Sequence, residues 1–493
     1  MKINITEQTK EVKYENPFEL YKKLSNNGNY LSLLMESKSP NQKYERKSII
    51  ADCVAIKIIG KGEEFRIIGL NKTGEEILLQ FKQTDFNYSE NYKQTNTEIT
   101  GIVRKQENDE LSEEDNTKLQ NISTVIKTIL AKFNSTNPYV GLYGVFAYDF
   151  AKNFYKVEER LKDEEHKDFE LFIPARIHVL YDDEKRAEII ELGFCGKNFT
   201  ACTQKNEFEF TKQKSSSKTD LSDEEYKTRV EKVVADIKNG RAMQCVLSRN
   251  TTIALEKHPF ESYTNLRETN PAPYSFYYNL GENEILYGAS PEMHIRIDDT
   301  SGGKEIQIRP IAGTIMRSTN PLEDAEARRK LMTDEKELRE HTMLVDLARH
   351  ELYKLCEIKS VEVTDLFTLE QYPNLYHLVS GVRGILKRDM TAIDALLITL
   401  PAGTLSGAPK KEAMKMIEQY EASRRGFYGG ASGFISFNGT CNTGITIRSV
   451  HVRNNCSEVR GGAGIVALST PEAELNEIKL KTAKMMSVLG EKK

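Results

Sequence analysis

A change in amino-acid composition at residues 204–222 constrains the fold of this chain more than any other feature. From residue 18 to about 200 the sequence is rich in short β-type runs, such as SIIADCVAIKIIG and EFRIIGL, separated by Gly, Asn and Lys. Residues 204–222 are poor in apolar residues and contain a KSSSK tract, which is typical of a linker. We therefore expect an N-terminal region over 18–200, a linker over 204–222 and a second domain over 223–488.

The second domain contains three segments with the apolar spacing and boundary signals of helices. DEEYKTRVEKVVADIKNG predicts an amphipathic helix that ends at Gly240. Residues 333–356 predict a long helix with Thr333 as its N-cap and acidic residues in its first turn. A last helix is expected near STPEAE, capped by Ser469 or Thr470, with Pro471 in the first turn.

Composition excludes several classes of protein. The chain has 493 residues, enough for two or three domains or one large two-part α/β fold. The net charge is −4 and no long basic block occurs, which argues against a nucleic-acid polymer as partner. The N-terminus lacks the apolar core of a signal peptide, and no run of 18 apolar residues predicts a membrane span. The seven cysteines include no C-x-x-C pair, so we expect reduced thiols and a cytoplasmic location.

Two groups of glutamates recur at helical spacing. Glu337 and Glu340 share one face of the first long helix, and Glu474, Glu477 and Lys481 share a face of the last. A solvated charged surface is one explanation. The other is that the carboxylates face each other around a hard divalent cation such as Mg²⁺, with an anionic substrate completing its shell.

Glycine-rich segments cluster in the same domain. PAGTLSGAPK, FYGGASG and RGGAGIV allow backbone N–H groups to approach an anion closely, but none matches a dinucleotide or P-loop pattern. RPIAGTIMR resembles a turn that holds an anion near the backbone. Arg448, in the strand-like GITIRSV, would bind a planar carboxylate or form a buried ion pair. His377 in YHLVSG is either a core histidine or the residue that handles a proton.

Taken together and in this order, these motifs resemble those of the chorismate-utilising enzymes, and most closely their anthranilate synthase component I group. The matching segments include GASPE, RPIAGT, DEKELREHTMLVDLAR, HLVSGVRG, PAGTLSGAPK and the closing E-x-x-E-x-x-x-K. The resemblance is strong over residues 225–485. It implies an α+β fold with stacked, largely antiparallel sheets, helices outside and the active site in a cleft of a chorismate-binding domain.

The resemblance also implies roles for individual residues. Glu340 and Glu477 would be the main Mg²⁺ ligands, supported by Glu337 and Glu474. Glu292 would be the general acid that protonates the departing C4 hydroxyl, and His377 would help to expel pyruvate. The remaining positions would bind chorismate: Gly313, Thr314, Thr404, Tyr428, Arg448, Gly462, Ala463, Gly464 and Lys481.

Two positions point to the nucleophile. Members of the family that form 4-amino-4-deoxychorismate carry a lysine where this chain has Ala312, and isochorismate-forming members carry a lysine where it has Gln244. Without these lysines, ammonia attack and formation of anthranilate are expected. Alternatives are a synthase that stops at 2-amino-2-deoxyisochorismate and a degenerate chorismate-binding subunit.

LLMES and NPAPY resemble the two halves of a feedback site for L-tryptophan. The resemblance assigns Ser37, Lys47, Pro273 and Tyr274 to this site, with Ser275 where the family commonly has Met. Other departures from the family are His350, Glu351 and Ile478. No glutamine amidotransferase domain is recognisable, so the ammonia is expected from a separate amidotransferase subunit in a hetero-oligomer, or from free ammonium.

Overall fold

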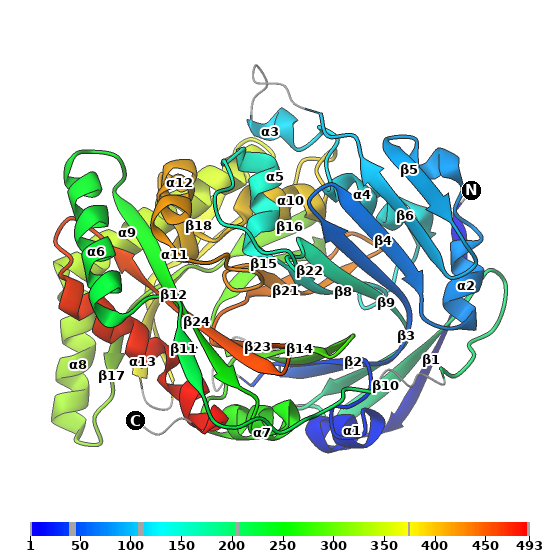
Figure 1. Ribbon diagram of the computed structural model, residues 1–493, viewed down its shortest axis with the longest axis horizontal. Coiled ribbons are helices and arrows are strands. Elements are labelled where there is room, and N and C mark those ends of the chain that lie inside the picture. The colour runs from blue at the N-terminus through cyan, green and yellow to red at the C-terminus, as the bar shows by residue number, and fades with distance from the viewer. Residues whose placement is uncertain (1, 39–45, 107–112, 203–206, 373–374, 491–493) are drawn as a thin grey trace.

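The computed structural model describes residues 2–38, 46–106, 113–202, 207–372 and 375–490. Two long strands, β3 (Lys47–Lys61) and β9 (Phe169–Tyr181), pair with each other and connect two layers of sheet (Figure 1). Among the described strands, only β1 and β7 pair in parallel. The expected α+β fold with largely antiparallel sheets is therefore confirmed.

Each layer combines strands from both halves of the sequence. The layer that extends from β3 contains β2 (Ser32–Glu36), β13 (Tyr274–Gly281), β14 (Glu284–Ser290), β23 (Ser449–Arg453), β24 (Cys456–Ile465) and β12 (Gln244–Ala254). The layer that extends from β9 contains β8 (Gly141–Phe146), β21 (Ala431–Ser436), β22 (Cys441–Ile445), β15 (Met293–Thr300), β16 (Gly303–Ile308), β19 (Leu375–Ile385), β17 (Ile311–Met316) and β18 (Glu362–Gln371). The remaining strands are β1 (Ile3–Lys13), β4 (Glu64–Gly69), β5 (Ser89–Gln94), β6 (Glu98–Val103), β7 (Phe133–Asn134), β10 (Arg186–Phe194), β11 (Ser217–Thr219) and β20 (Gly407–Ala408).

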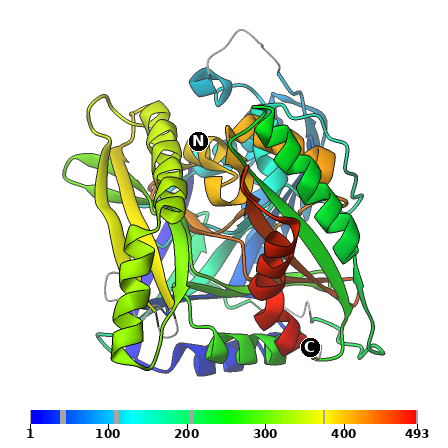
Figure 2. The same ribbon diagram turned by 90° about the vertical axis from the view of Figure 1, so that its left-hand side faces the viewer.

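Helices cover the outside of these layers (Figures 1 and 2). The helices of at least seven residues are α1 (Pro17–Leu24), α2 (Lys72–Leu78), α4 (Ser123–Lys132), α6 (Asp223–Lys238), α7 (Pro259–Thr269), α8 (Pro321–Thr333), α9 (Glu335–Leu355), α10 (Ala392–Thr399), α12 (Lys410–Tyr420) and α13 (Pro471–Leu489). The short ones are α3 (Glu113–Asn116), α5 (Lys152–Tyr155) and α11 (Gly403–Ser406). No helix among the described residues is long and apolar enough to cross a membrane.

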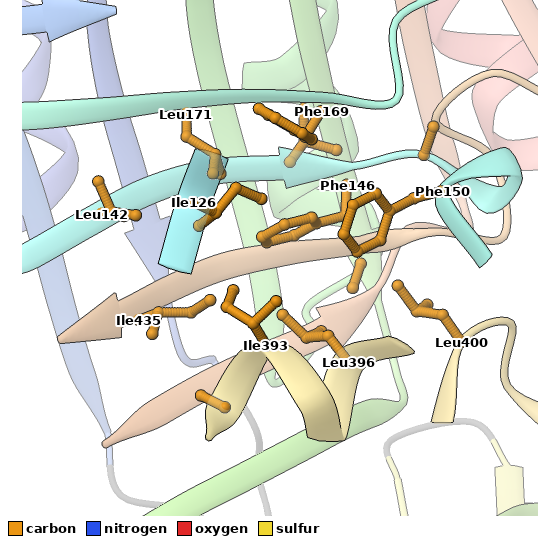
Figure 3. Close-up of a cluster of buried hydrophobic side chains, with 14 of the residues drawn as sticks. Ile126, Leu142, Phe146, Phe150, Phe169, Leu171, Ile393, Leu396, Leu400 and Ile435 are labelled. Atoms are coloured by element: carbon orange, nitrogen blue, oxygen red, sulfur yellow. The ribbon is translucent and has the colours of Figure 1, made fainter. Parts of the chain in front are cut away.

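The hydrophobic core is built by both halves of the chain. Figure 3 shows Phe146 and Phe169 from the first half packing near Ile393, Leu396 and Leu400 from the second. All five are buried. The division into 18–200 and 223–488 stays a prediction, and the first three residues of the expected linker, 204–206, lie outside the described residues.

Helix boundaries differ from the expectation at one important point. Thr333 is the last residue of α8, and the N-cap of α9 is Asp334, whose side chain accepts from the backbone N–H groups of Lys336 and Glu337. Prediction of Thr333 as the cap was therefore wrong, because a separate helix occupies the preceding residues. At α13 the N-cap is Thr470 and Pro471 begins the helix, as expected.

Two local expectations were also wrong. RPIAGTIMR is not a turn, because residues 311–316 form β17, with an irregularity in pairing at Gly313, whose φ is +74°. Arg448 does not lie on a strand. It lies between β22 and β23 with a φ of +51°, in the left-handed region that residues other than glycine seldom adopt.

The cysteines do not all remain free. Cys53 on β3 and Cys202 form a disulfide, with their Cα atoms 5.4 Å apart. The expectation that every thiol is reduced is therefore wrong for this pair. Separated by 149 residues, the two cysteines gave no spacing signal in the sequence.

Candidate active site

Glu292 is a buried carboxyl group immediately before β15. It is buried, and the hydroxyl of Thr404 donates to its Oε1 atom at 3.0 Å. Burial raises the pKa of Glu292 to about 8, against the opposing effect of the Thr404 hydrogen bond. The carboxyl group is therefore mostly protonated at neutral pH, the state that a general acid requires.

His377 lies on β19 opposite Thr314 of β17. The hydroxyl of Thr314 is 2.9 Å from Nδ1 of His377, and the carbonyl oxygen of Gly313 is 3.4 Å from the same atom. Burial lowers the pKa of His377 to about 4. The ring is therefore neutral at neutral pH and can accept a proton there.

The predicted glutamates come from α9, which packs against β17 and β19, and from α13, which packs against β24 (yellow-green and red in Figure 2). Burial raises the pKa of Glu340 on α9, and the charge of Glu477 on α13 raises it further. Glu474 shows the same two effects, again with Glu477 as the neighbouring charge. For Glu337, burial and then the charge of Glu340 raise the pKa. The two pairs therefore face each other across the site.

This set of carboxylates fits a hard divalent cation. It offers only oxygen ligands, and the buried Oε2 atom of Glu474 has no hydrogen-bond partner among the described residues. A cation would supply that partner and reduce the mutual repulsion. No group of three or more His, Cys, Asp or Glu side chains in the described part of the chain is placed to hold a metal ion by itself, so water and ligand oxygens would have to complete the shell. A purely solvated charged face does not describe Glu474, which is buried.

The glycines of β24 lie where a side chain would collide with the site. A Cβ atom on Gly462 would lie 3.0 Å from the hydroxyl oxygen of Tyr428, and one on Gly464 would lie 2.8 Å from Nε2 of Gln244. Ala463, between them, is fully buried. The expected cradle of backbone groups and Tyr428 is therefore present in one place.

Arg448 and Lys481 extend this cradle toward the glutamates. The guanidinium of Arg448 donates to the carbonyl oxygen of Lys481, and Nζ of Lys481 donates to the carbonyl oxygen of Gly462 at 3.0 Å. Lys481 also pairs with Glu477 at 2.6 Å. Arg448 forms no ion pair within the described residues, and burial lowers its pKa. Its charge thus remains available for an anionic ligand.

The structure reveals contacts that the sequence patterns did not indicate. Nε2 of Gln244 donates to Oε1 of Glu340 at 3.0 Å, which places Gln244 beside a predicted metal ligand. The unusual Glu351 forms a buried ion pair with Lys410. Both pairs join residues far apart in sequence, so no spacing pattern could have shown them.

The two halves of the expected tryptophan site are also neighbours. The backbone N–H of Ser37 donates to the carbonyl oxygen of Lys47, and that of Lys38 donates to Ala272, each at 3.0 Å. Strand β2, which contains most of LLMES, pairs directly with β13, which begins at the last residue of NPAPY. The structure therefore brings together segments that are more than 200 residues apart.

The side chains of this region differ in their surroundings. Pro273 and Ser275 are buried, and the Ser275 hydroxyl donates to Ala272. Nζ of Lys47 donates to the hydroxyl of Tyr139 at 3.1 Å. The hydroxyl of Tyr274 donates to Asn442 at 3.1 Å. A ligand carboxylate would have to approach Lys47 beside Tyr139.

Comparison with known proteins identifies the family. Residues 75–487 match the family described as chorismate binding enzyme. Anthranilate synthase component 1 of Buchnera aphidicola subsp. Diuraphis noxia is 32% identical over 473 residues, which cover 90% of both chains. The corresponding protein of Acetivibrio thermocellus is 39% identical over 273 residues, 55% of this chain and 54% of that protein, so this alignment spans about half of the relative.

A solved structure shows the same fold. The crystal structure of anthranilate synthase component I from Streptococcus pneumoniae TIGR4 matches with a TM-score of 0.68 and 27% sequence identity. The match covers 89% of this chain and 92% of that one. Because the family match spans most of the sequence and includes the acid, the glycine-rich strand and both glutamate helices, this chain belongs to the family of chorismate binding enzymes.

Proposed function

We propose that this protein is the component I of an anthranilate synthase, which converts chorismate and ammonia into anthranilate, pyruvate and water. The observation that carries the proposal is the burial of Glu292, which raises the pKa of its carboxyl group to about 8, beside a site rich in groups for binding anions. Chorismate carries two carboxylates, and the glutamate helices and the Arg448 cradle would bind one each. Its C4 hydroxyl is a poor leaving group unless it is protonated.

The chemistry would proceed in two stages. Glu292 gives its proton to the C4 hydroxyl, which leaves as water while ammonia forms a bond to C2. The C2 proton then passes to a base as the enolpyruvyl C–O bond breaks, and the enolpyruvate takes up a proton to become pyruvate. The neutral ring of His377 is suited to assist this second stage.

Substrate and metal binding would be divided among the elements described above. Glu340 and Glu477 would hold Mg²⁺, with Glu337 and Glu474 in support. When bound, Mg²⁺ would neutralise these carboxylates and allow the ring carboxylate of chorismate to approach. The second carboxylate would accept hydrogen bonds from the cradle formed by Arg448, Tyr428 and residues 462–464.

The choice of nucleophile follows from two uncharged side chains. Ala312 on β17 carries no nucleophile, and Gln244 cannot act as a base toward water. Gln244 instead donates to Glu340. Ammonia is then the nucleophile that this site would admit.

The test is incubation with chorismate and ammonium, with and without Mg²⁺, followed by fluorescence. Anthranilate fluoresces and 2-amino-2-deoxyisochorismate does not, so the assay separates the proposal from a synthase that stops early. Fluorescence that appears only with Mg²⁺ and ammonium supports the proposal. Binding of chorismate without turnover would instead indicate a regulatory subunit.

Glutamine would serve as nitrogen donor only through a second protein. The relatives are named component 1, and we infer that a glutamine amidotransferase subunit delivers ammonia to this chain. Purified protein should use ammonium but not glutamine. Turnover with glutamine in the absence of a second protein would refute this inference.

L-Tryptophan would inhibit through the region formed by Ser37, Lys47 and residues 273–275. A short path connects this region to the acid. The ring of Tyr274 lies against Gly444, where a Cβ atom would be 2.6 Å from the ring, and the next residue, Ile445, donates its N–H to the carbonyl oxygen of Glu292 at 3.0 Å. Binding that shifts Tyr274 would therefore shift the acid, with a coupling of about 1–3 kcal/mol.

A further inference from the structure

A buried ion pair lies behind the candidate site and belongs to none of the groups considered so far. Glu421 directly follows α12, and Arg425 lies four residues later. Their side chains are 0% and 1% exposed, and Nη2 of Arg425 is 2.6 Å from Oε1 of Glu421. Nε of Arg425 also contacts Oε2 of Glu421 at 3.0 Å.

The first contact of this pair is with the middle of β12. Oε1 of Glu421 accepts from the backbone N–H of Ser248 at 2.8 Å and from its hydroxyl at 2.7 Å. Nη2 of Arg425 donates to the carbonyl oxygen of Val246 at 2.8 Å. In the β12–β24 ladder, Ser248 lies opposite Gly462 and Val246 lies opposite Gly464. The pair therefore fixes β12 at the residues opposite the two glycines of the cradle.

The second contact is with α11, the short helix that carries Thr404. Nη1 of Arg425 donates to the carbonyl oxygen of Leu405 at 2.6 Å. Thr404, the preceding residue, donates to Glu292 at 3.0 Å. The position of the general acid's hydrogen-bond partner is thus set by Arg425.

The third contact is with Tyr428. Its backbone N–H donates to the carbonyl oxygen of Arg425 at 3.2 Å, and its ring centroid lies 5.9 Å from the guanidinium carbon. The same guanidinium lies 4.4 Å from the ring of Tyr148. Tyr428 is the residue whose hydroxyl approaches Gly462.

We propose that Glu421 and Arg425 are positioning residues, which hold α11, Tyr428 and the β12–β24 ladder in the one arrangement that fits chorismate. A planar guanidinium can donate in several fixed directions at once, which an ammonium group cannot reproduce. A buried ion pair contributes little net stability compared with an apolar replacement. Positioning therefore accounts for the three contacts better than stability does.

Two variants test this proposal. Glu421→Gln with Arg425→Met removes both charges of the pair. Arg460, which also lies 3.4 Å from Oε2 of Glu421, keeps Asp220 at 3.8 Å as a charged neighbour. Arg425→Lys keeps the charge but loses the bonds to Val246 and Leu405. We expect both variants to fold, with kcat/KM for chorismate reduced by roughly 100-fold, the loss associated with misplacement of about 1 Å. KM should rise as well, because the cradle is displaced.

The pH profile adds a readout that a purely structural role would not move. The Thr404 hydrogen bond lowers the pKa of Glu292, so a shift of α11 that breaks this bond should move the alkaline limb of kcat/KM to higher pH. A matched control is the buried pair Lys57–Glu170, which lies 2.7 Å apart with side chains 3% and 0% exposed. Lys57→Met with Glu170→Gln should leave KM, kcat and the alkaline limb unchanged.

Arg425→Lys decides the question if the double variant does not fold. A folded Arg425→Lys protein with wild-type kcat, KM and pH profile would overturn the proposal. The inference rests on the proposed function for the identity of the ligand. If the wild type does not turn over chorismate, the proposed function fails, and the role of the pair is then read from chorismate affinity by calorimetry. Equal affinity of wild type and Arg425→Lys would overturn that role too.

Discussion

Replacing Glu292 with Gln should make the protein more stable and nearly inactive at the same time. The side chain is 6% exposed, and burial raises its pKa from 4.5 to about 8. Between these two values the folded protein holds a proton that the unfolded chain has released, so stability falls as pH rises through this range. At pH 7 the raised pKa of Glu292 lowers the free energy of unfolding by about 3 kcal/mol relative to low pH, since each pH unit above 4.5 contributes about 1.4 kcal/mol.

Gln is neutral at every pH and nearly the same shape, so Glu292→Gln removes this cost. We expect its free energy of unfolding to exceed that of the wild type by about 2–3 kcal/mol at pH 7 and by little at pH 4.5. Turnover of chorismate should fall by about 10²–10⁴, the contribution of a general acid. Urea unfolding at both pH values, combined with an anthranilate assay, measures both effects.

The matched control is Glu224→Gln on α6, whose side chain is 81% exposed. It should change neither activity nor the difference in stability between pH 4.5 and pH 7 by more than a few tenths of a kcal/mol. The reasoning fails if Glu292→Gln shows no stabilisation at pH 7, or if it retains more than a tenth of wild-type turnover.

Four further variants or conditions probe the rest of the site. Glu340→Gln should abolish turnover at low Mg²⁺, measured by Mg²⁺ titration, and near-normal activity there would show that the glutamate helices carry only surface charge. Gly464→Ala should raise KM for chorismate roughly tenfold or more, because its Cβ would lie 2.8 Å from Nε2 of Gln244; an unchanged KM contradicts the cradle. Because burial lowers the pKa of His377 and so favours its neutral form, the free energy of unfolding should decline as pH falls from 6.5 toward 4. The decline should be smaller in His377→Gln than in the wild type, and an equal decline in both would contradict this prediction. Ser37→Phe should abolish inhibition by L-tryptophan in a chorismate titration, whereas equal inhibition of the variant and wild type would remove the assigned site.

Much of the site could be anticipated because its chemistry is encoded by local signals. Glu474 and Glu477 share a helix face through their spacing, and glycine marks positions 462 and 464 of β24, where a Cβ atom would lie within 3.0 Å of a neighbouring side chain. The structure adds the third dimension, in which α9 and α13 turn their carboxylates toward each other. That approach depends on the paths of the strands against which α9 and α13 pack, and the spacing of residues along a helix does not determine those paths.

Other features had no sequence signal at all. Arg448 was expected on a strand because its neighbours are apolar, but it lies between β22 and β23 and has a positive φ. Cys53 and Cys202 pair across 149 residues. The contacts of Arg425 with Val246 and Leu405 appear only when β12 and α11 are placed in space. Long-range pairing of this kind is decided by packing of the whole fold.

The most direct test of the proposed activity is mass-spectrometric identification of the product formed from chorismate, Mg²⁺ and ¹⁵N-labelled ammonium. Ala312 and Gln244, in place of a nucleophilic and a basic side chain, predict anthranilate that carries one ¹⁵N atom, with pyruvate released in equal amount. Isochorismate, or a product aminated at C4, as the main species would contradict the account.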